Sequence, residues 1–326
     1  MTNIKIKEVA LYHPTKVVDN SLYEQHFTEK GRDITHFLQV MGKKNRHIID
    51  KDNENSLSMA IEASHQVLMK ANMNGKDIDY IVFATQTPEY TFPSNAMFIH
   101  DAIRANPQSV AIDMNANCAG MTVAVEQASR YMLSNSSIQT ALVIGSDYLS
   151  LIANPEQEIT YATYGDAACA VILEKTMEQT GFIDSSYQIV TAHVDKIIYP
   201  QKGFSQSIKA DGRYIHFEPF DASFSAPIII NLFDKILERN SLKITDISAV
   251  CISQFAFGDK LKLEESYLID SKKVIYIGDQ FGYTGSSSPF IAFHEGVQDG
   301  RIKRGDYVMF WTVGAGHQFI AMLWKY

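Results

Sequence analysis

Hydrophobic and polar positions in the first half of the chain follow two alternating patterns. The segment LSMAIEASHQVLMKA, residues 57–71, is amphipathic, and the apolar run IDYIVFAT, residues 78–85, has the length and composition of a buried strand. Residues on one face of the predicted helix are Leu57, Ile61, Ser64, Leu68 and Ala71. The pattern predicts a helix followed by a strand.

The second half repeats this order. APIIINLFDKIL, residues 226–237, reads as a helix with Pro227 in its first turn, and ISAVCIS, residues 247–253, reads as the strand behind it. Three pairs of strand-like segments match at a nearly constant offset, starting at Asp77 and Asp246, Ser109 and Lys273, and Thr140 and Asp306. The repeat indicates a duplicated α/β protein with mostly parallel sheets covered by helices, and two halves, 1–175 and 176–326.

One cysteine stands where a helix should begin. After Cys118, buried-type residues recur with helical period at Met121, Val125, Ala128 and Met132. A helix N-terminus favours an anion, so we expect the pKa of the Cys118 thiol to fall and the thiolate to act as a nucleophile. The alternative is a cysteine that only fills the core, which is the interpretation we prefer for Cys169 and Cys251, inside apolar runs.

Composition narrows the function classes. The chain has 326 residues, 46% of them hydrophobic, and a formal net charge of −8, so nucleic acid is not an expected partner. No apolar run reaches membrane-spanning length, and the first residues lack the layout of a secretory signal, so we expect a cytoplasmic location without membrane contact. The three cysteines are widely spaced, which favours neither disulfides nor a metal site.

The chain resembles the ketoacyl-ACP synthase III family of the thiolase fold. The resemblance covers almost the whole chain, through the motifs KNRHI, FATQTPEYTFPSNA, NANCAGM, ALVIGSDYL, YGDAACAVILE, GYTGSSSP and DGRIKRGDYVMFWTVGAG. It implies a duplicated, five-layered αβαβα subunit and a dimer in which Phe92 approaches the neighbouring active site. It implies Cys118 as the acyl acceptor, with an oxyanion held by its own amide and by Ala315 between Gly314 and Gly316. It implies no bound cofactor, and a thioester of acyl carrier protein phosphopantetheine, or of coenzyme A, as substrate.

Two catalytic partners of the family are replaced. Gln254 stands in the position of the family's histidine and Tyr283 in that of its asparagine. Both side chains can donate a hydrogen bond to an oxyanion, but neither is a base at neutral pH. His317, directly after the glycine turn, is the one histidine that we nominate as a base, against the alternative that it only lines the pocket.

Positions expected to hold coenzyme A have also changed. The residues there are His36, Val40, Leu151 and Asp259. Without cations at these positions the charge-assisted bonds to adenine and phosphates are lost, so a carrier protein is the preferred donor. Basic residues that could meet a carrier are Arg213, Lys260 and Lys262.

These observations support two functions. The first is an acyltransferase or condensing enzyme that forms an acyl thioester on Cys118 and passes the acyl group to a second substrate, in fatty-acid-like or specialised metabolism. The alternative is a catalytically weak structural partner that completes a heterodimer with an active paralogue. Thioester hydrolysis ranks below both because it needs a base that only His317 could supply.

Overall fold

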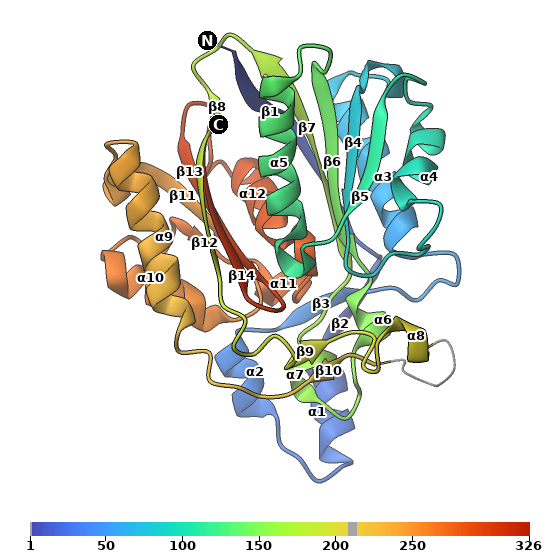
Figure 1. The fold of residues 1–326 in the computed structure, drawn as a ribbon. Helices are drawn as coiled ribbons and strands as arrows, with labels where there is room; N and C mark the ends of the chain where they lie inside the picture. The colour runs from blue at the N-terminus through green and yellow to red at the C-terminus, as the bar shows by residue number, and fades with distance from the viewer. Residues whose placement is uncertain (1, 208–213) are drawn as a thin grey trace.

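The computed structural model describes residues 2–207 and 214–326, in which two five-stranded sheets lie side by side (Figure 1). The first sheet has the order β1-β7-β6-β4-β5, and the second has the order β8-β14-β13-β11-β12. The strands of the first sheet are β1 (Asn3–Tyr12), β4 (Tyr80–Ala84), β5 (Val110–Met114), β6 (Thr140–Asp147) and β7 (Ala167–Thr176). Those of the second are β8 (Gly181–Ile189), β11 (Ile247–Ile252), β12 (Val274–Ile275), β13 (Tyr307–Gly314) and β14 (Gln318–Lys325).

The two sheets match strand for strand, which confirms the duplication seen in the sequence. The three predicted pairs of segments are β4 with β11, β5 with β12, and β6 with β13, and each pair occupies the same place in its sheet. The chain crosses from the first sheet to the second between Thr176 and Gly181.

The expectation of mostly parallel sheets is wrong. Only the β6-β4-β5 and β13-β11-β12 parts are parallel, while β1, β7, β8 and β14 pair antiparallel with their neighbours. A parallel pair needs a long crossover, whereas β13 and β14 are joined by three residues, which permits only an antiparallel hairpin.

Helices cover both sheets and fill the space between them, giving five layers. The outer face of the first sheet packs on α3 (Ser56–Ala71) and α4 (Asn95–Ile103), and that of the second on α9 (Ser225–Arg239) and α10 (Phe257–Tyr267). Between the sheets lie α5 (Gly120–Ser134) and α12 (Ser288–Gln298) (Figure 1). The predicted helix face of α5, Met121, Val125, Ala128 and Met132, is buried in this central layer.

Shorter elements surround the end of the sheets where α5 begins (Figure 1). They are β2 (Lys16–Asp19), α1 (Asn20–Thr28), α2 (Thr35–Met41), β3 (Asn45–Ile48), α6 (Leu149–Ile152), α7 (Glu158–Tyr161), β9 (Ile197–Ile198), α8 (Phe204–Ser207), β10 (His216–Phe217) and α11 (Gly278–Phe281). No helix among the described residues is both long and apolar enough to span a membrane.

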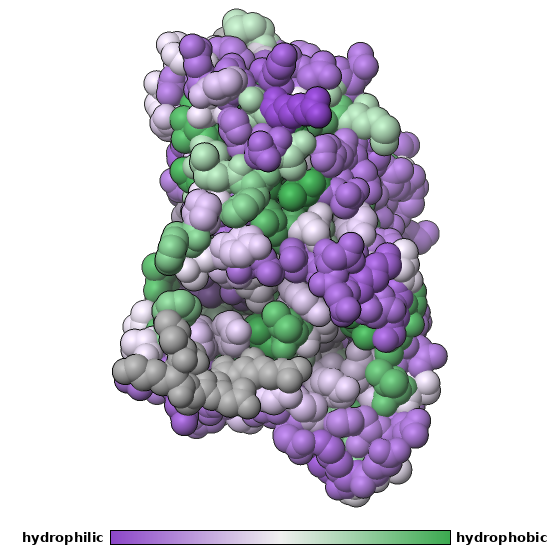
Figure 2. Space-filling model, turned by 90° about the vertical axis from the view of Figure 1, so that its right-hand side faces the viewer, coloured by the Kyte–Doolittle hydropathy of each residue, from purple (hydrophilic) through white to green (hydrophobic). Residues whose placement is uncertain are grey.

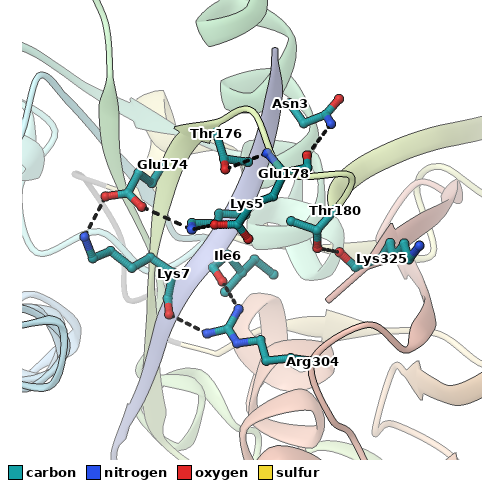
Figure 3. A network of polar contacts seen from close by, with 10 residues as sticks. All are labelled: Asn3, Lys5, Ile6, Lys7, Glu174, Thr176, Glu178, Thr180, Arg304 and Lys325. Carbon is teal, nitrogen blue, oxygen red and sulfur yellow. Dashed lines mark hydrogen bonds and ion pairs between the residues drawn. The ribbon is translucent and has the colours of Figure 1, made fainter. Parts of the chain in front are cut away.

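A network of polar contacts around the start of β1, here called the polar seam, joins the two halves (Figure 3). Lys7 pairs with Glu174 at 2.6 Å and Lys5 with Glu178 at 2.8 Å, beside two cavities of about 310 and 650 Å³. Across the seam, Arg304 donates to the carbonyl oxygens of Ile6 at 2.6 Å and Lys7 at 2.7 Å, where an irregularity interrupts the pairing of β1 with β7. Cys118 is not among the residues of the seam.

Arg304→Ala should lower the free energy of unfolding by about 1.5–3 kcal/mol, because the charged donor serves two backbone carbonyls and stacks on Tyr326, 3.9 Å from the ring centroid. Urea unfolding measures this loss, and Arg301→Ala, which removes only a local pair with Asp299, is the control. Equal stability of the two variants would contradict the role of Arg304 as the link between the halves.

Candidate active site

Cys118 lies in a single 3₁₀ turn, Asn117–Ala119, that leads directly into α5. The strand β5 ends four residues earlier, so the cysteine stands at the point where strand turns into helix, as the sequence predicts. Cys118 is partly exposed, whereas Cys169 and Cys251 are fully buried in β7 and β11. The core interpretation of the other two cysteines is therefore confirmed.

Three groups converge on the Cys118 sulfur. The amide of Gln86 places Oε1 3.7 Å and Nε2 3.8 Å from Sγ, and the Tyr283 hydroxyl and the Ala315 backbone N–H lower the pKa of the thiol as hydrogen-bond donors. Burial nevertheless raises the pKa of the thiol above its ordinary value, while the bonds from Tyr283 and Gln86 lower it. The expected fall in the thiol pKa is therefore wrong, because loss of solvent outweighs these donors.

Gln86 is a residue that sequence reasoning missed, and Asp147 holds it. The Asp147 carboxylate is fully buried and accepts bonds from the Gln86 backbone N–H at 2.8 Å and from Gln86 Nε2 at 3.2 Å. It also accepts from Thr85 Oγ1 and from the backbone N–H of Ser286. A signal was available: Gln86 and Asp147 stand at the carboxyl ends of neighbouring parallel strands, β4 and β6, where sites form in α/β sheets.

The glycine turn lies beside Cys118, where β13 turns into β14. Thr312 Oγ1 donates to the Cys118 carbonyl oxygen at 3.2 Å, and Asn117 Nδ2 donates to the Ala315 carbonyl oxygen at 3.1 Å. A Cβ on Gly314 would lie 2.5 Å from the Ala116 carbonyl oxygen, so only glycine permits this approach. The turn is thereby held beside Cys118, where the Ala315 N–H lowers the pKa of the thiol.

Tyr283 is buried, and its ring packs against Phe255 at 5.1 Å and Tyr164 at 6.0 Å between centroids. Burial raises the pKa of its phenol far above the ordinary value, so the hydroxyl stays protonated and can donate to Cys118. Around these residues is an apolar cluster formed by Leu149, Ile152, Ala153, Tyr164, Ile215 and Tyr283, against which Cys118, Tyr161, Ile197 and Phe255 pack.

Gln254 does not serve the site as expected. Its side chain is fully buried, and Nε2 donates to the carbonyl oxygens of Ile252 at 2.8 Å and Ile275 at 3.1 Å. Its Oε1 accepts from the backbone N–H groups of Ile277 at 2.7 Å and Gly278 at 3.1 Å. The expectation that this amide donates to a substrate oxygen is corrected, because both of its hydrogens and both lone pairs are already bound to backbone.

His317 is buried on the far side of the glycine turn. Its ring packs against Phe220 at 4.9 Å and Phe224 at 5.3 Å, with His193 at 6.3 Å. Burial lowers the pKa of the ring, and Nδ1 has no hydrogen-bond partner among the described residues. The thiol partners described above do not include this ring, so its role as a base remains a prediction.

The predicted surface residues have different outcomes. Lys260 is buried and bonded to Glu264, Ser271 and the Val274 carbonyl oxygen, so its expected role in carrier binding is wrong. Lys262 is exposed, and Arg213 lies outside the described residues. Of the positions expected to hold coenzyme A, His36, Val40 and Leu151 are exposed, and burial raises the pKa of the Asp259 carboxyl to about 6.

An apolar surface lies near the edge of the first sheet. Phe92 is 86% exposed, and Tyr90, Met97, Phe98 and Val110 are also exposed around α4 and β5. Figure 2 views the molecule from the side of α4, where hydrophobic residues gather above a hollow. Within the described residues, β5 has no strand on its outer edge, which leaves backbone groups for another chain to pair with.

The described residues hold no group of three or more histidine, cysteine or acidic side chains arranged to bind a metal ion. The groups described at Cys118 are the amide of Gln86, the hydroxyl of Tyr283 and the backbone N–H of Ala315.

Known proteins resemble this chain in sequence and in fold. Residues 112–189 match the family model of 3-oxoacyl-[acyl-carrier-protein] synthase III, and residues 237–326 match the model of its C-terminal part. A beta-ketoacyl-[acyl-carrier-protein] synthase III of Solibacter usitatus is 28% identical over 100% of this chain and 99% of its own length. The enzyme of the same name from Wolbachia pipientis is 30% identical over 88% of this chain and 89% of its own.

Solved structures share the fold. The 3-oxoacyl-[acyl-carrier-protein] synthase III of Aquifex aeolicus superposes with a TM-score of 0.87 at 24% identity, covering 99% of this chain and 100% of that one. A variant of OleA from Xanthomonas campestris superposes with a TM-score of 0.83 at 18% identity, covering 100% and 98%. With the sequence matches, these show that the chain has the thiolase fold and belongs to the 3-oxoacyl-[acyl-carrier-protein] synthase III family of acyl-transferring condensing enzymes.

Proposed function

We propose that this protein is an acyltransferase or condensing enzyme that loads an acyl group from a carrier thioester onto Cys118 and transfers it to a second substrate. The observation that carries the proposal is that the Gln86 amide lies within 3.8 Å of the Cys118 sulfur at the head of α5, with the Tyr283 hydroxyl and the Ala315 N–H as further donors. No metal or organic cofactor takes part in the proposed reaction.

Acyl loading exchanges one thioester for another. The Cys118 sulfur attacks the thioester carbon, a new C–S bond forms, and the carbonyl oxygen carries negative charge in the tetrahedral intermediate. We propose that the N–H groups of Ala315 and Cys118 bind this oxygen. The C–S bond to the carrier then breaks, and the proton that left Cys118 ends on the carrier thiol.

We propose acyl carrier protein as the source of the acyl group. The four positions expected to grip coenzyme A contain no lysine or arginine, and one of them, Asp259, is acidic. A phosphopantetheine arm needs none of these nucleotide contacts, and the exposed Lys262 remains available to an acidic carrier. The acceptor we propose is an oxygen, nitrogen or preformed carbon nucleophile.

The partner we propose is a second copy of this chain, because family members are typically dimers and the exposed β5 edge carries Phe92 and its apolar neighbours. A heterodimer with a related chain, in which this subunit is catalytically weak, is the second candidate. The observation in its favour is that the Gln254 amide is bound entirely to backbone.

Exposure to an acyl carrier thioester should raise the intact mass of the protein by one acyl group. Cys118→Ala should abolish this gain, and Cys169→Ala, which alters a fully buried cysteine, should retain it. The same acyl group offered on free coenzyme A should load much more slowly. Light scattering of the same preparation gives its oligomeric state.

Two outcomes would contradict the proposal. An equal mass gain in Cys118→Ala would remove the cysteine from the mechanism. No gain in the native protein would favour the heterodimer candidate, whereas rapid loading from coenzyme A would overturn only the choice of carrier.

A further inference from the structure

The protein lacks a base among the groups that meet the Cys118 sulfur in the described part of the chain. These groups are the Tyr283 hydroxyl, the Ala315 N–H and the amide of Gln86. An amide does not titrate, and the phenol stays protonated because burial raises its pKa. Departure of the thiol proton must therefore be assisted by hydrogen bonding rather than by proton abstraction.

Gln86 can bond to both protonation states of the thiol. Its Oε1, 3.7 Å from Sγ, accepts the S–H hydrogen of the neutral thiol. Its Nε2, 3.8 Å from Sγ, has two hydrogens, one of which binds Asp147 while the other is free to approach the sulfur. Once the proton has left, the thiolate accepts that second hydrogen.

Asp147 determines which way the amide faces. A carboxylate only accepts hydrogen bonds, so Oδ2 at 3.2 Å must face the nitrogen of the Gln86 amide and not its oxygen. The carboxylate is itself held from both halves of the chain, by the Gln86 backbone N–H at 2.8 Å and the Ser286 N–H at 2.7 Å. The orientation of Gln86 is therefore set before a substrate binds.

The backbone at Gly285 lies so close to the side chains of Gln86 and Asp147 that no larger residue fits there. A Cβ on Gly285 would lie 2.3 Å from Asp147 Oδ2 and 2.7 Å from Gln86 Nε2, and Gly285 has a positive φ of 66°. The segment that carries Tyr283 thus also provides the space in which the Gln86 and Asp147 side chains meet.

We infer that Gln86 is a catalytic residue that stabilises the Cys118 thiolate during acyl loading, and that Asp147 is a positioning residue acting through the Gln86 amide. The inference rests on the proposed loading of Cys118. In that step the S–H bond breaks, the S–C bond forms, and the proton passes to the departing carrier thiol, so Gln86 takes up no proton.

Alkylation of Cys118 by iodoacetamide tests the role of Gln86 without any acyl donor. Its rate is followed by mass spectrometry of the Cys118 peptide from about pH 6 to pH 10, which spans the range in which thiols titrate. Gln86→Leu should react about tenfold more slowly near neutral pH, and its pH profile should move up by about one unit. Gln298→Leu, on the exposed end of α12, is the control and should match the native protein.

A second comparison tests Asp147. The alkylation rate of the Asp147→Asn variant is compared with that of the double variant Gln86→Leu, Asp147→Asn. If Asp147 acts through Gln86, the double variant should react almost as fast as Asp147→Asn alone. The direct effect of the lost charge on the thiol cancels in this comparison. Equal slowing in both backgrounds would overturn the positioning role.

An unchanged alkylation profile in Gln86→Leu would overturn the whole inference, and this result decides alone if Asp147→Asn does not fold. If the native protein fails to load an acyl group but Gln86→Leu shifts the alkylation profile, the proposed function is wrong and the role of Gln86 is supported. If the native protein loads an acyl group but Gln86→Leu does not shift the profile, the proposed function is supported and the role of Gln86 is wrong.

Discussion

Gln254→Leu should lower the free energy of unfolding by about 2–6 kcal/mol, since two buried N–H groups that lose their acceptor cost roughly 1–3 kcal/mol each. These are the N–H groups of Ile277 and Gly278, which now donate to Oε1. Leucine fills a similar volume, so a cavity contributes little to the loss. Urea unfolding followed by fluorescence gives the value.

Acylation of the Gln254→Leu variant distinguishes a structural role of Gln254 from the catalytic role that its motif suggests. Below its melting temperature, Gln254→Leu should still gain an acyl group on Cys118, because the amide has no hydrogen left for a substrate oxygen. Gln298→Leu should change stability by no more than about 0.5 kcal/mol, as is usual for surface positions. A stable Gln254→Leu variant that cannot be acylated would show that Gln254 belongs to the catalytic machinery.

The order of motifs in the sequence predicted the fold and the place of Cys118 at the head of a helix, because both depend on local pattern. The helix that follows Cys118 has its buried face where the spacing of Met121 and Val125 placed it. The duplication could be predicted because equivalent strands keep equivalent positions along the chain. Antiparallel pairing could not be predicted, since an apolar strand such as β7 has the same hydrophobic pattern in a parallel and in an antiparallel sheet.

The missed features depend on contacts between distant segments. Gln86 and Asp147 are 61 residues apart, and Gln254 bonds to a backbone 23 and 24 residues away. The pKa of the Cys118 thiol likewise depends on how far the fold removes it from solvent, which the helix N-terminus alone could not reveal. Lys260 reads as surface in the sequence, yet Ser271 and Val274 bind its ammonium group beneath α10.

The wild-type protein should release carbon dioxide from a malonyl carrier much more slowly than it loads an acyl group on Cys118. Decarboxylation places negative charge on an enolate oxygen, and each missing donor to such a charge costs about 2.7–4 kcal/mol of barrier, or roughly a hundred- to a thousandfold in rate. On our expectation that Gln254 stands in the place of the family's histidine, one donor is missing, because the Gln254 amide is bound to backbone. The Tyr283 hydroxyl remains, but it already acts as a donor to the Cys118 thiol, whose pKa it lowers.

The bulk of Tyr283 should limit the reaction further, and variants at this position separate its two effects. Its ring packs against Phe255 and Tyr164, so a malonyl carboxylate would compete with it for the space beside the thiol. Tyr283→Asn keeps a donor and removes the ring, and it should raise the release of labelled carbon dioxide, whereas Tyr283→Phe keeps the bulk without the hydroxyl and should release no more than the native protein. Gln254→His should not restore the reaction by itself, because imidazole cannot replace the four backbone bonds of the amide. Rapid release of carbon dioxide by the native protein, unchanged in Tyr283→Asn, would contradict this prediction and make the enzyme a decarboxylating synthase. Negligible release, together with transfer of the acyl group from Cys118 to an added nucleophile, would assign the enzyme to non-decarboxylative acyl transfer.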